Sequence, residues 1–335
     1  MLIVMNSDAE QGEIDGVVRA VESLGCRAHV MPGASRIAVG VTGNEEAIDT
    51  GPFANLPGVA EAIRVTKPFK LTSLDARPER TVVDVNGARI GGGSLAIIAG
   101  PCAVESRDQA FAAAQAVQRS GAQFFRGGAF KPRTSPYSFA GLGEEGLKIL
   151  GEVRKEFGLR VVTEALDEST VGLVEKYADM IQIGSRNMQN FTLLRRAGRS
   201  RLPVLLKRGM AATLEEWLLA AEYVMSEGNY QIVLCERGVR TFSQHARNTL
   251  DLAAIPAMRR MSHLPLIIDA AHGTGHNYMV APLARAGIAA GADGVMIEVH
   301  PCPASALSDG EQTLTIDEYR RLVEQLQAIR EAITR

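Results

Sequence analysis

The chain has 335 residues, of which 46% are hydrophobic and 5% aromatic, with a formal net charge of −2 at pH 7. This length exceeds that of an ordinary compact domain unless the domain is a barrel, and the apolar fraction supports a large core. The nearly balanced charge excludes a general attraction to nucleic acid or to an anionic membrane, so any anion site must be local.

The opening residues and the cysteines bear on the cellular compartment. Met1-Leu-Ile-Val lacks the basic segment of a secretory signal, and no apolar run reaches the roughly 20 residues of a membrane span. The cysteines, at positions 26, 102, 235 and 302, have neither zinc-knuckle nor disulfide-framework spacing. We therefore expect a reducing, cytoplasmic compartment, with no nucleic-acid or membrane partner.

Residues 1–66 predict a small domain of their own. The first helix is expected at 9–24, because Ile14, Val17 and Val21 share one face and Gly25 ends it. A weaker helix is expected at 45–56, and strands at 2–5, 26–31, 37–41 and 59–65. The order βαββαβ is typical of ferredoxin-like domains. Such a domain binds a ligand or a second copy, or only stabilises the rest of the chain, and its residues leave both readings open.

Residues 67–81, with Pro68 and Pro78, predict a linker, and residues 82–335 predict a second domain. In the stretch 82–90, Asn86-Gly87 lies between alternating apolar residues, which predicts a β-hairpin. Strands are then expected at 95–99, 123–126, 160–163, 180–183, 204–207, 231–235, 266–269 and 294–298. Helices are expected around 106–120, 143–157, 169–177, 190–197, 213–227, 248–259, 279–290 and 316–334.

This alternation of eight strands and eight helices predicts a (β/α)₈ barrel. A doubly wound open sheet is the alternative, but no Gly-x-Gly-x-x-Gly fingerprint follows the first strand.

Polar residues gather at the carboxyl ends of the predicted strands, where barrel enzymes build their active sites. One set is cationic and comprises Arg126, Lys131, Arg186, Lys207 and Arg237. Because these charges would repel one another, we expect them to surround two phosphates, or a phosphate and a carboxylate. A second set offers a thiolate, an imidazole and two carboxylates, which suit a divalent metal: Cys102, His272, Glu298 and Asp309.

The loop 126–139 stands out within the cationic set. It reads Arg126-Gly-Gly-Ala-Phe-Lys-Pro-Arg-Thr-Ser-Pro-Tyr-Ser-Phe, so it combines cations and hydroxyls with two glycines and two prolines. The glycines permit close approach to a ligand, and the prolines stiffen the loop before a ligand arrives. We interpret it as a phosphate-binding loop, with a solvated surface loop as the alternative.

These stretches resemble 3-deoxy-D-arabino-heptulosonate 7-phosphate (DAHP) synthases, in the subtype with an amino-terminal ferredoxin-like regulatory domain. The resemblance covers essentially the whole chain. It rests on Ile98-Ala-Gly-Pro-Cys102-Ala-Val-Glu-Ser, the loop from Arg126, Val162-Thr-Glu-Ala, Ile181-Gln-Ile-Gly-Ser-Arg186-Asn, Pro203-Val-Leu-Leu-Lys207-Arg-Gly, Leu234-Cys-Glu-Arg237-Gly and Val299-His-Pro with Leu307-Ser-Asp309-Gly.

The resemblance implies a metal-dependent transferase that condenses phosphoenolpyruvate with erythrose 4-phosphate, the first step of the shikimate pathway to chorismate and the aromatic amino acids. Phosphoenolpyruvate would contact Arg126, Lys131, Arg186, Lys207 and Arg237. Erythrose 4-phosphate would contact Lys131, Pro132, Arg133 and Thr134. The divalent metal (manganese, iron, zinc, cobalt or similar) would bind Cys102, His272, Glu298 and Asp309. Lys131, His272 and Cys102 would be catalytic, with Lys131 as the proton donor.

The same resemblance implies inhibition by an aromatic amino acid at the amino-terminal domain, a homotetramer, and a chorismate mutase partner as a further option. Alternatives are a 3-deoxy-8-phosphooctulonate synthase, another metal-dependent aldolase, or a non-catalytic sensor and scaffold.

Two positions depart from the family pattern. Asp269-Ala-Ala-His272 replaces the usual Asp-Pro-Ser-His, which is expected to alter the surroundings of His272. Cys302 replaces other residues; we expect it to be small and buried, with a redox or disulfide role as the alternative.

Overall fold

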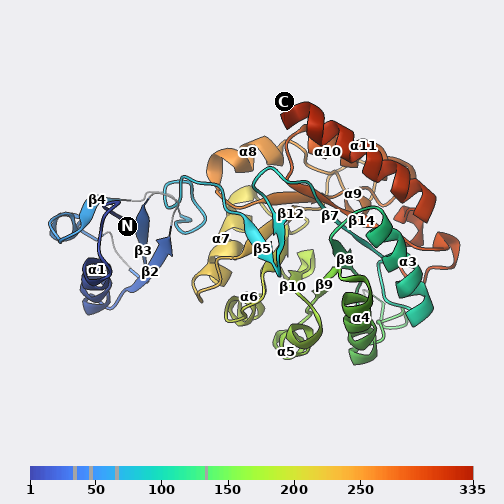
Figure 1. The fold of residues 1–335 in the computed structure, drawn as a ribbon, viewed down its shortest axis with the longest axis horizontal. Coiled ribbons are helices and arrows are strands. Elements are labelled where there is room, and N and C mark those ends of the chain that lie inside the picture. Colours follow the sequence, from blue (N-terminus) through green and yellow to red (C-terminus); the bar gives the residue numbers. More distant parts are fainter. Residues whose placement is uncertain (33–35, 45–47, 65–67, 133–134, 335) are drawn as a thin grey trace.

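The computed structural model describes residues 1–32, 36–44, 48–64, 68–132 and 135–334. A small amino-terminal sheet domain lies beside a larger barrel, and the long last helix runs along the outside of the barrel (Figure 1). No helix of the described residues is long and apolar enough to cross a membrane.

The amino-terminal domain has the predicted ferredoxin-like order. Its elements are β1 (Leu2–Met5), α1 (Gln11–Ser23), β2 (Arg27–Pro32), β3 (Ile37–Thr42), α2 (Gly51–Ala54) and β4 (Val59–Ile63). The strands pair antiparallel in the order β2-β3-β1-β4. Helix α1 packs Ile14, Val17 and Val21 into a small core with Phe53.

The second helix of this domain is shorter than predicted. Within the described residues it is the four-residue α2, which begins after Thr50 with Pro52 in its first turn. Three residues of the predicted span, 45–47, lie outside the described part of the chain.

The segment after residue 67 fastens this domain to the barrel. Phe69 and Leu71 join a hydrophobic cluster with Leu2 and Met31 of the small domain and with the barrel core. The carboxylate of Glu222, on a barrel helix, accepts hydrogen bonds from Lys70 N (2.8 Å), Thr72 N (2.7 Å) and Thr72 Oγ1 (3.0 Å).

The predicted hairpin is confirmed. Strands β5 (Val83–Val85) and β6 (Ala88–Ile90) pair antiparallel around Asn86-Gly87, which has φ values of 52° and 88°. Two positive φ values are typical of the tight turns that suit hairpins. The buried side chains of the hairpin pack with residues inside the barrel, and Asn86 Nδ2 donates to Asp179 just before β10 (3.3 Å). The hairpin therefore plugs the mouth at the amino ends of the strands.

The barrel is closed by eight parallel strands, which confirms the predicted fold and excludes an open sheet. They are β7 (Ala96–Gly100), β8 (Phe124–Arg126), β9 (Arg160–Glu164), β10 (Met180–Ile183), β11 (Val204–Lys207), β12 (Ile232–Glu236), β13 (Leu266–Asp269) and β14 (Gly294–Glu298). The α-helices around them are α3 (Arg107–Arg119), α4 (Glu144–Phe157), α5 (Glu168–Tyr177), α6 (Phe191–Gly198), α7 (Leu214–Met225), α8 (Ala254–Met261), α9 (Ala270–Thr274), α10 (Asn277–Ala289) and α11 (Ile316–Thr334).

Departures from prediction cluster at the loops after β10, β12, β13 and β14. Helix α8 begins at Ala254, six residues after the predicted 248, because Thr249 pairs instead with Val239 in an isolated bridge. Helix α9 was not predicted; the side chain of Asp269 caps it by accepting from His272 N at 3.0 Å. Three short 3₁₀ turns were also missed: η1 (Ser185–Asn187), η2 (Pro303–Ser305) and η3 (Gly310–Gln312).

Candidate active site at the carboxyl ends of the barrel strands

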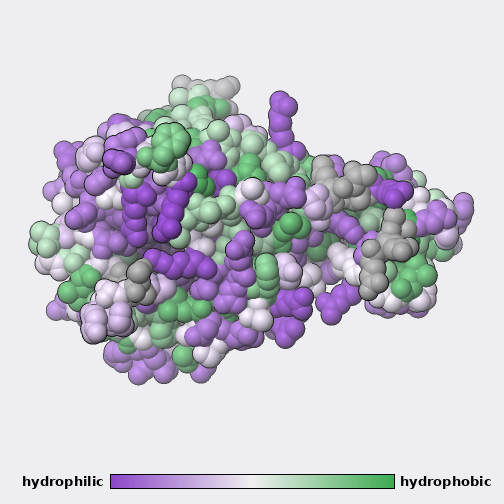
Figure 2. All heavy atoms as spheres, turned by 180° about the vertical axis from the view of Figure 1, so that it is seen from behind, coloured by the Kyte–Doolittle hydropathy of each residue, from purple (hydrophilic) through white to green (hydrophobic). Residues whose placement is uncertain are grey.

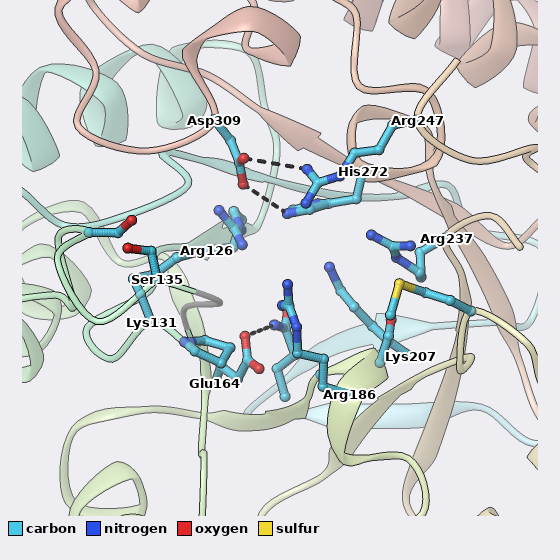
Figure 3. Close-up of a pocket in the computed structure, with 16 residues that line it drawn as sticks. Arg126, Lys131, Ser135, Glu164, Arg186, Lys207, Arg237, Arg247, His272 and Asp309 are labelled. Atoms are coloured by element: carbon cyan, nitrogen blue, oxygen red, sulfur yellow. Dashed lines mark hydrogen bonds and ion pairs between the residues drawn. The ribbon is translucent and has the colours of Figure 1, made fainter. Parts of the chain in front are cut away.

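A cavity of about 300 Å³ opens at the carboxyl ends of the strands, opposite the hairpin. The predicted cations Arg126, Lys131, Arg186, Lys207 and Arg237 all line it, and their side chains surround a common hollow (Figure 3). Seen from the back, hydrophilic side chains gather on this face of the barrel (Figure 2). The cationic set of the sequence is therefore one site in space.

The barrel explains why these residues meet. Arg126 and Lys207 are the last residues of β8 and β11, Arg237 follows β12 directly, and Arg186 lies in η1 just after β10. Parallel strands of a barrel end at the same mouth, so residues far apart in the chain converge there. Lys131 comes from the loop after β8. A Cβ at Gly128 would lie 2.8 Å from the Lys131 side chain and 2.9 Å from Cys102 O, so this close approach requires glycine.

Three of the five cations, Arg126, Lys207 and Arg237, are buried with only partial compensation, whereas Lys131 is half-buried and Arg186 is exposed. Arg126 pairs with Glu298 (3.2 Å) and Lys207 with Asp269 (2.5 Å), and all four side chains are at most 5% exposed. For Arg237, burial lowers the pKa of the guanidinium, although nearby Asp269 opposes this effect.

Several hydrogen-bond donors in this cavity have no partner. Among the described residues, Arg126 Nε, Ser185 Oγ and Arg237 Nη1 are buried side-chain atoms that make no hydrogen bond. All three residues line the cavity. An unsatisfied buried donor costs about 1–3 kcal/mol, so three of them in one hollow indicate a missing acceptor. An anion with several oxygens fits this requirement.

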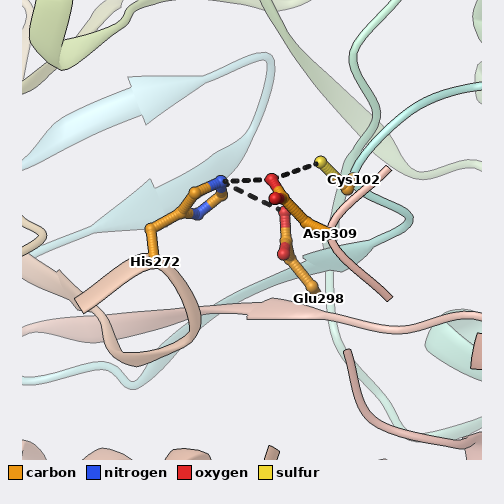
Figure 4. Close-up of side chains that lie close together, drawn as sticks. All are labelled: Cys102, His272, Glu298 and Asp309. Carbon is orange, nitrogen blue, oxygen red and sulfur yellow. Dashed lines mark hydrogen bonds and ion pairs between the residues drawn. The ribbon is translucent and has the colours of Figure 1, made fainter. Parts of the chain in front are cut away.

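Beside the cations lies a cluster of four potential metal ligands. One ligand atom each from Cys102, His272, Glu298 and Asp309 lies within 4.8 Å of all the others (Figure 4). His272 Nε2 is 3.4 Å from Glu298 Oε1 and 3.7 Å from Asp309 Oδ2, while Cys102 Sγ is 3.2 Å from Asp309 Oδ2. Two carboxylates and a thiol crowded this closely repel one another once ionised, so the donor set fits a divalent cation.

A surrounding layer of hydrogen bonds orients these four residues. His272 Nδ1 bonds to Asp269 Oδ2 (2.8 Å), which directs Nε2 toward the other three ligands. Gln312 Nε2 donates to Glu298 Oε2 (2.6 Å), and Arg247 Nη1 pairs with Asp309 Oδ1 (3.4 Å). Asp309 itself has a φ of 53°, a backbone conformation uncommon outside glycine that is found at functional sites.

Two members of the cluster, Cys102 and Asp309, have pKa values shifted in opposite directions. Burial, together with the charge of Glu298, raises the pKa of the Cys102 thiol to about 11. Burial opposes ionisation of Asp309, but the charge of His272 and a hydrogen bond from Cys102 outweigh it and lower its pKa to about 2. Without a cation, the cluster therefore combines a neutral thiol with an ionised Asp309 carboxylate.

The structure also bears on the two departures from the family pattern. Ala270 and Ala271 are buried in α9, and Asp269 orients His272 without help from them. Cys302 was expected to be buried; this was wrong, because it lies exposed in the loop after β14, with its N–H donating to His300 Nδ1 (3.0 Å). The thiol of Cys302 is free rather than part of a disulfide.

The predicted site residues within the described part of the chain come together, and Pro132 lines the same cavity. Arg133 and Thr134 lie outside the described residues. Sequence reasoning missed Arg247, Gln182 and Ser185 as lining residues, whereas Ser138 belongs to the predicted phosphate-binding loop 126–139. Arg247 belongs to a long loop without periodicity, and Gln182 lies inside a strand, so position gave no signal for either.

The family follows from comparison with known proteins. Residues 76–335 match the family model described as "DAHP synthetase I family", and residues 1–67 match "DAHP synthase ferredoxin-like domain". The chain belongs to the DAHP synthetase I family. As expected from the sequence, it is a condensing enzyme of this family with a ferredoxin-like domain at its amino end.

Individual relatives agree. A phospho-2-dehydro-3-deoxyheptonate aldolase of Thermotoga maritima is 46% identical over 333 residues, which cover 99% of this chain and 98% of the relative. A crystal structure of the Thermotoga maritima DAHP synthase has a TM-score of 0.79 at 45% identity and covers 99% of this chain and 97% of its own. A truncated form from the same organism has a TM-score of 0.75 at 47% identity, over 79% of this chain and 97% of its own.

The octulosonate alternative is a more distant relation. A 2-dehydro-3-deoxyphosphooctonate aldolase of Syntrophobacter fumaroxidans is 34% identical and covers 72% of this DAHP synthase chain and 90% of its own length.

Proposed function

We propose that the site condenses phosphoenolpyruvate with erythrose 4-phosphate to give DAHP and inorganic phosphate. The observation that carries this proposal is the combination of three unsatisfied buried donors and a four-residue metal-ligand cluster in one barrel mouth. A substrate with two anionic groups, a carboxylate and a phosphate, supplies the missing acceptors. The metal-ligand cluster lies at the side of the same cavity.

The cationic residues hold phosphoenolpyruvate in this proposal. Arg126, Arg186, Lys207 and Arg237, with Lys131, surround its carboxylate and phosphate and stabilise the charge that develops there. Lys131 and Pro132, with Arg133 and Thr134, hold the four-carbon sugar phosphate. C3 of phosphoenolpyruvate then forms a carbon–carbon bond to the aldehyde carbon, water adds at C2, and phosphate leaves by cleavage of the C2–O bond.

Cys102, His272, Glu298 and Asp309 hold the divalent metal, whose identity we leave open among manganese, iron, zinc, cobalt and similar ions. When bound, it supplies Lewis-acid polarisation of the aldehyde oxygen. His272 contributes its Nε2 because Asp269 occupies Nδ1.

Lys131 is the proposed proton donor to the new hydroxyl. Its Nζ lies 3.0 Å from Cys102 Sγ and 3.1 Å from Cys102 O, between the anion-binding residues and the cluster. A group that serves both substrates can deliver a proton to the oxygen where the bond forms.

The amino-terminal domain is proposed to bind an aromatic amino acid that inhibits the enzyme, within a homotetramer; a chorismate mutase is a further candidate partner. The family match of residues 1–67 and the contacts that fasten this domain to the barrel support a regulatory role.

The deciding experiment measures phosphate release from phosphoenolpyruvate with erythrose 4-phosphate and with arabinose 5-phosphate, using metal-reconstituted protein. We expect turnover with the four-carbon sugar and little with the five-carbon one. Preference for the five-carbon sugar would favour the octulosonate synthase, and no release with either would favour a non-catalytic scaffold.

A further inference from the structure

A second charged cavity lies at the opposite mouth of the barrel. It has a volume of about 320 Å³ and lies beside the hairpin, where the segment Gly91-Gly-Gly leads into β7. Three arginines from distant parts of the chain line it: Arg80 before the hairpin, Arg259 near the end of α8, and Arg330 on α11. None of these residues belongs to the active site.

The arginines have limited compensation. Arg259 Nη2 pairs with Asp293 Oδ1 at 3.2 Å, and Asp293 is the one carboxylate among the lining residues. Its other oxygen already accepts from Leu266 N (2.8 Å). Three positive charges and one negative charge leave a net charge of two on the cavity wall, since His263 is held neutral by burial, which lowers its pKa to about 4.

The guanidiniums also repel one another. Burial and the charge of Arg259 lower the pKa of Arg80. The pKa of Arg330 is lowered by burial and by Arg259, although Asp293 opposes the shift. Like charges brought together in a partly buried cavity destabilise the fold unless an anion joins them.

The unsatisfied donors that mark the active site recur here. Arg330 Nε is a buried atom without a hydrogen-bond partner among the described residues. Of the five side-chain atoms with this property in the described chain, three line the active site and this one lines the second cavity.

A purely structural reading is that the arginines serve as helix caps. Arg80 donates to Ser262 O (2.6 Å) and to Arg259 O, Arg259 donates to Gly291 O (Nε, 3.0 Å), and Arg330 donates to Ala292 O. These carbonyls lie at or just after the ends of α8 and α10, where cations are favourable. Capping accounts for each arginine singly, but it explains neither the cavity they share nor the unsatisfied Nε.

We propose that this cavity binds a small, doubly charged oxyanion of the phosphate or phosphate-monoester class. Two negative charges neutralise the wall, and a tetrahedral oxyanion accepts from several guanidinium donors at once. The volume exceeds what inorganic phosphate needs, and the lining also includes Met258, Leu264 and Pro265, which can contact a short carbon skeleton.

The test uses the full-length chain with anion binding at the active site weakened by Arg186→Gln and Arg237→Gln, so that binding at the second cavity can be followed. Inorganic phosphate, and separately glycerol 3-phosphate, is titrated calorimetrically at constant ionic strength. We expect one saturable site per chain, and tighter binding of glycerol phosphate if a monoester is the natural ligand. Adding Arg330→Gln is expected to weaken binding at least about ten-fold.

Arg321→Gln is the matched control, because it removes the same charge from the same helix, α11, at an exposed residue that does not line the cavity. It should leave the titration unchanged. If Arg330→Gln fails to fold, Arg80→Gln, at an exposed residue, replaces it in the comparison. Absence of saturable binding, or binding that neither variant weakens, overturns the proposal; lower stability without a change in binding identifies the arginines as helix caps only. The active-site function is tested separately, by measuring phosphoenolpyruvate turnover by the chain that lacks the Arg186→Gln and Arg237→Gln substitutions.

Discussion

At the residue scale, the active site depends on a few side chains that each touch two partners. Lys131 approaches Cys102 and lines the anion cavity, and Asp309 meets His272 and Arg247. The sequence could predict the residue types, because cations, a cysteine, a histidine and carboxylates follow strand ends. It could not predict Arg247 or Gln312, because their contacts depend on how the loops after β12 and β14 fold back over the mouth.

Lys131→Met tests the proton donor. The variant keeps the length and apolar stem of the side chain but removes its proton, so turnover should fall by about 100-fold or more with metal content unchanged. Lys148→Met, at an exposed lysine on α4, is the control and should behave like the wild type. Turnover close to wild type in metal-loaded Lys131→Met would show that another group donates the proton.

Cys102→Ser tests the metal ligands. A neutral hydroxyl is a poor substitute for a thiolate toward a soft divalent ion, so metal content and turnover should fall together, each by at least about ten-fold. Metal content is measured by elemental analysis after gel filtration. Cys302→Ser, at an exposed cysteine in the loop after β14, should lose neither. Full activity of the wild type after exhaustive chelation would refute the metal assignment.

At the scale of elements, the periodic part of the chain was predictable and the mouth was not. The eight barrel strands and the long helices follow apolar patterns that local sequence displays, and the hairpin follows its Asn-Gly turn. Helix α9 is only five residues long and exists because the Asp269 carboxylate caps it while holding His272. Short elements defined by side-chain contacts carry no period, which is why the departures cluster around the site.

One of the connections between elements should make stability depend on pH. His263 is buried between Thr81 Oγ1 (2.7 Å) and Leu71 O (2.8 Å), and burial lowers its pKa from 6.5 to about 4. In the unfolded chain His263 is protonated below pH 6.5, whereas in the folded chain it stays neutral down to about pH 4. Stability contributed by the neutral imidazole is present above pH 6.5 and is lost as the pH falls toward 4, by up to about 3 kcal/mol.

This dependence is measured as the free energy of unfolding in urea between pH 4 and 7.5. His263→Gln should lack that part of the slope, whereas His245→Gln, at an exposed histidine, should retain it. An identical slope in His263→Gln and in the wild type would assign the acid sensitivity to other groups.

The contact between α7 and the linker gives a second prediction at this scale. Burial raises the pKa of Glu222, whose Oε1 accepts from two backbone N–H groups and one hydroxyl. Glu222→Ala leaves these donors without that acceptor. The free energy of local opening of the linker should therefore fall by about 1–3 kcal/mol. Amide hydrogen exchange at Lys70 and Thr72 reports the change. Glu215→Ala, exposed on the same helix, should leave this exchange unaltered.

At the scale of the whole molecule, the small domain and the barrel meet through a mixed interface. Leu2 and Met31 pack with Leu71, and His29 Nδ1 lies 3.1 Å from the Tyr230 hydroxyl on the barrel side. The active site is built from residues after position 100, so the barrel holds its full set without the small domain.

Deletion of residues 1–66 should therefore leave condensation intact and abolish inhibition by tyrosine or phenylalanine. Initial rates with and without each amino acid are compared for the full and truncated chains, after circular dichroism confirms that the truncated barrel folds. Phe69→Ser and Leu71→Ser in the truncated chain would limit association through the apolar contact it exposes. Undiminished inhibition of the truncated enzyme would move the effector site to the barrel.

The carboxylate of Asp269 is shared between two sites. Its Oδ2 contacts Lys207 Nζ, from the cationic set, and His272 Nδ1, from the metal-ligand cluster. Burial opposes ionisation of Asp269, but both interactions help to keep its pKa well below the usual range. If the interaction of Lys207 or His272 with this oxygen becomes stronger or weaker, the interaction of the other residue with it changes as well. Occupancy of either subsite should thus shift the affinity of its neighbour, and thermodynamic reciprocity requires the same factor in both directions. For the proposed ligands, metal and phosphoenolpyruvate, each should therefore change the affinity of the other through this one carboxylate oxygen.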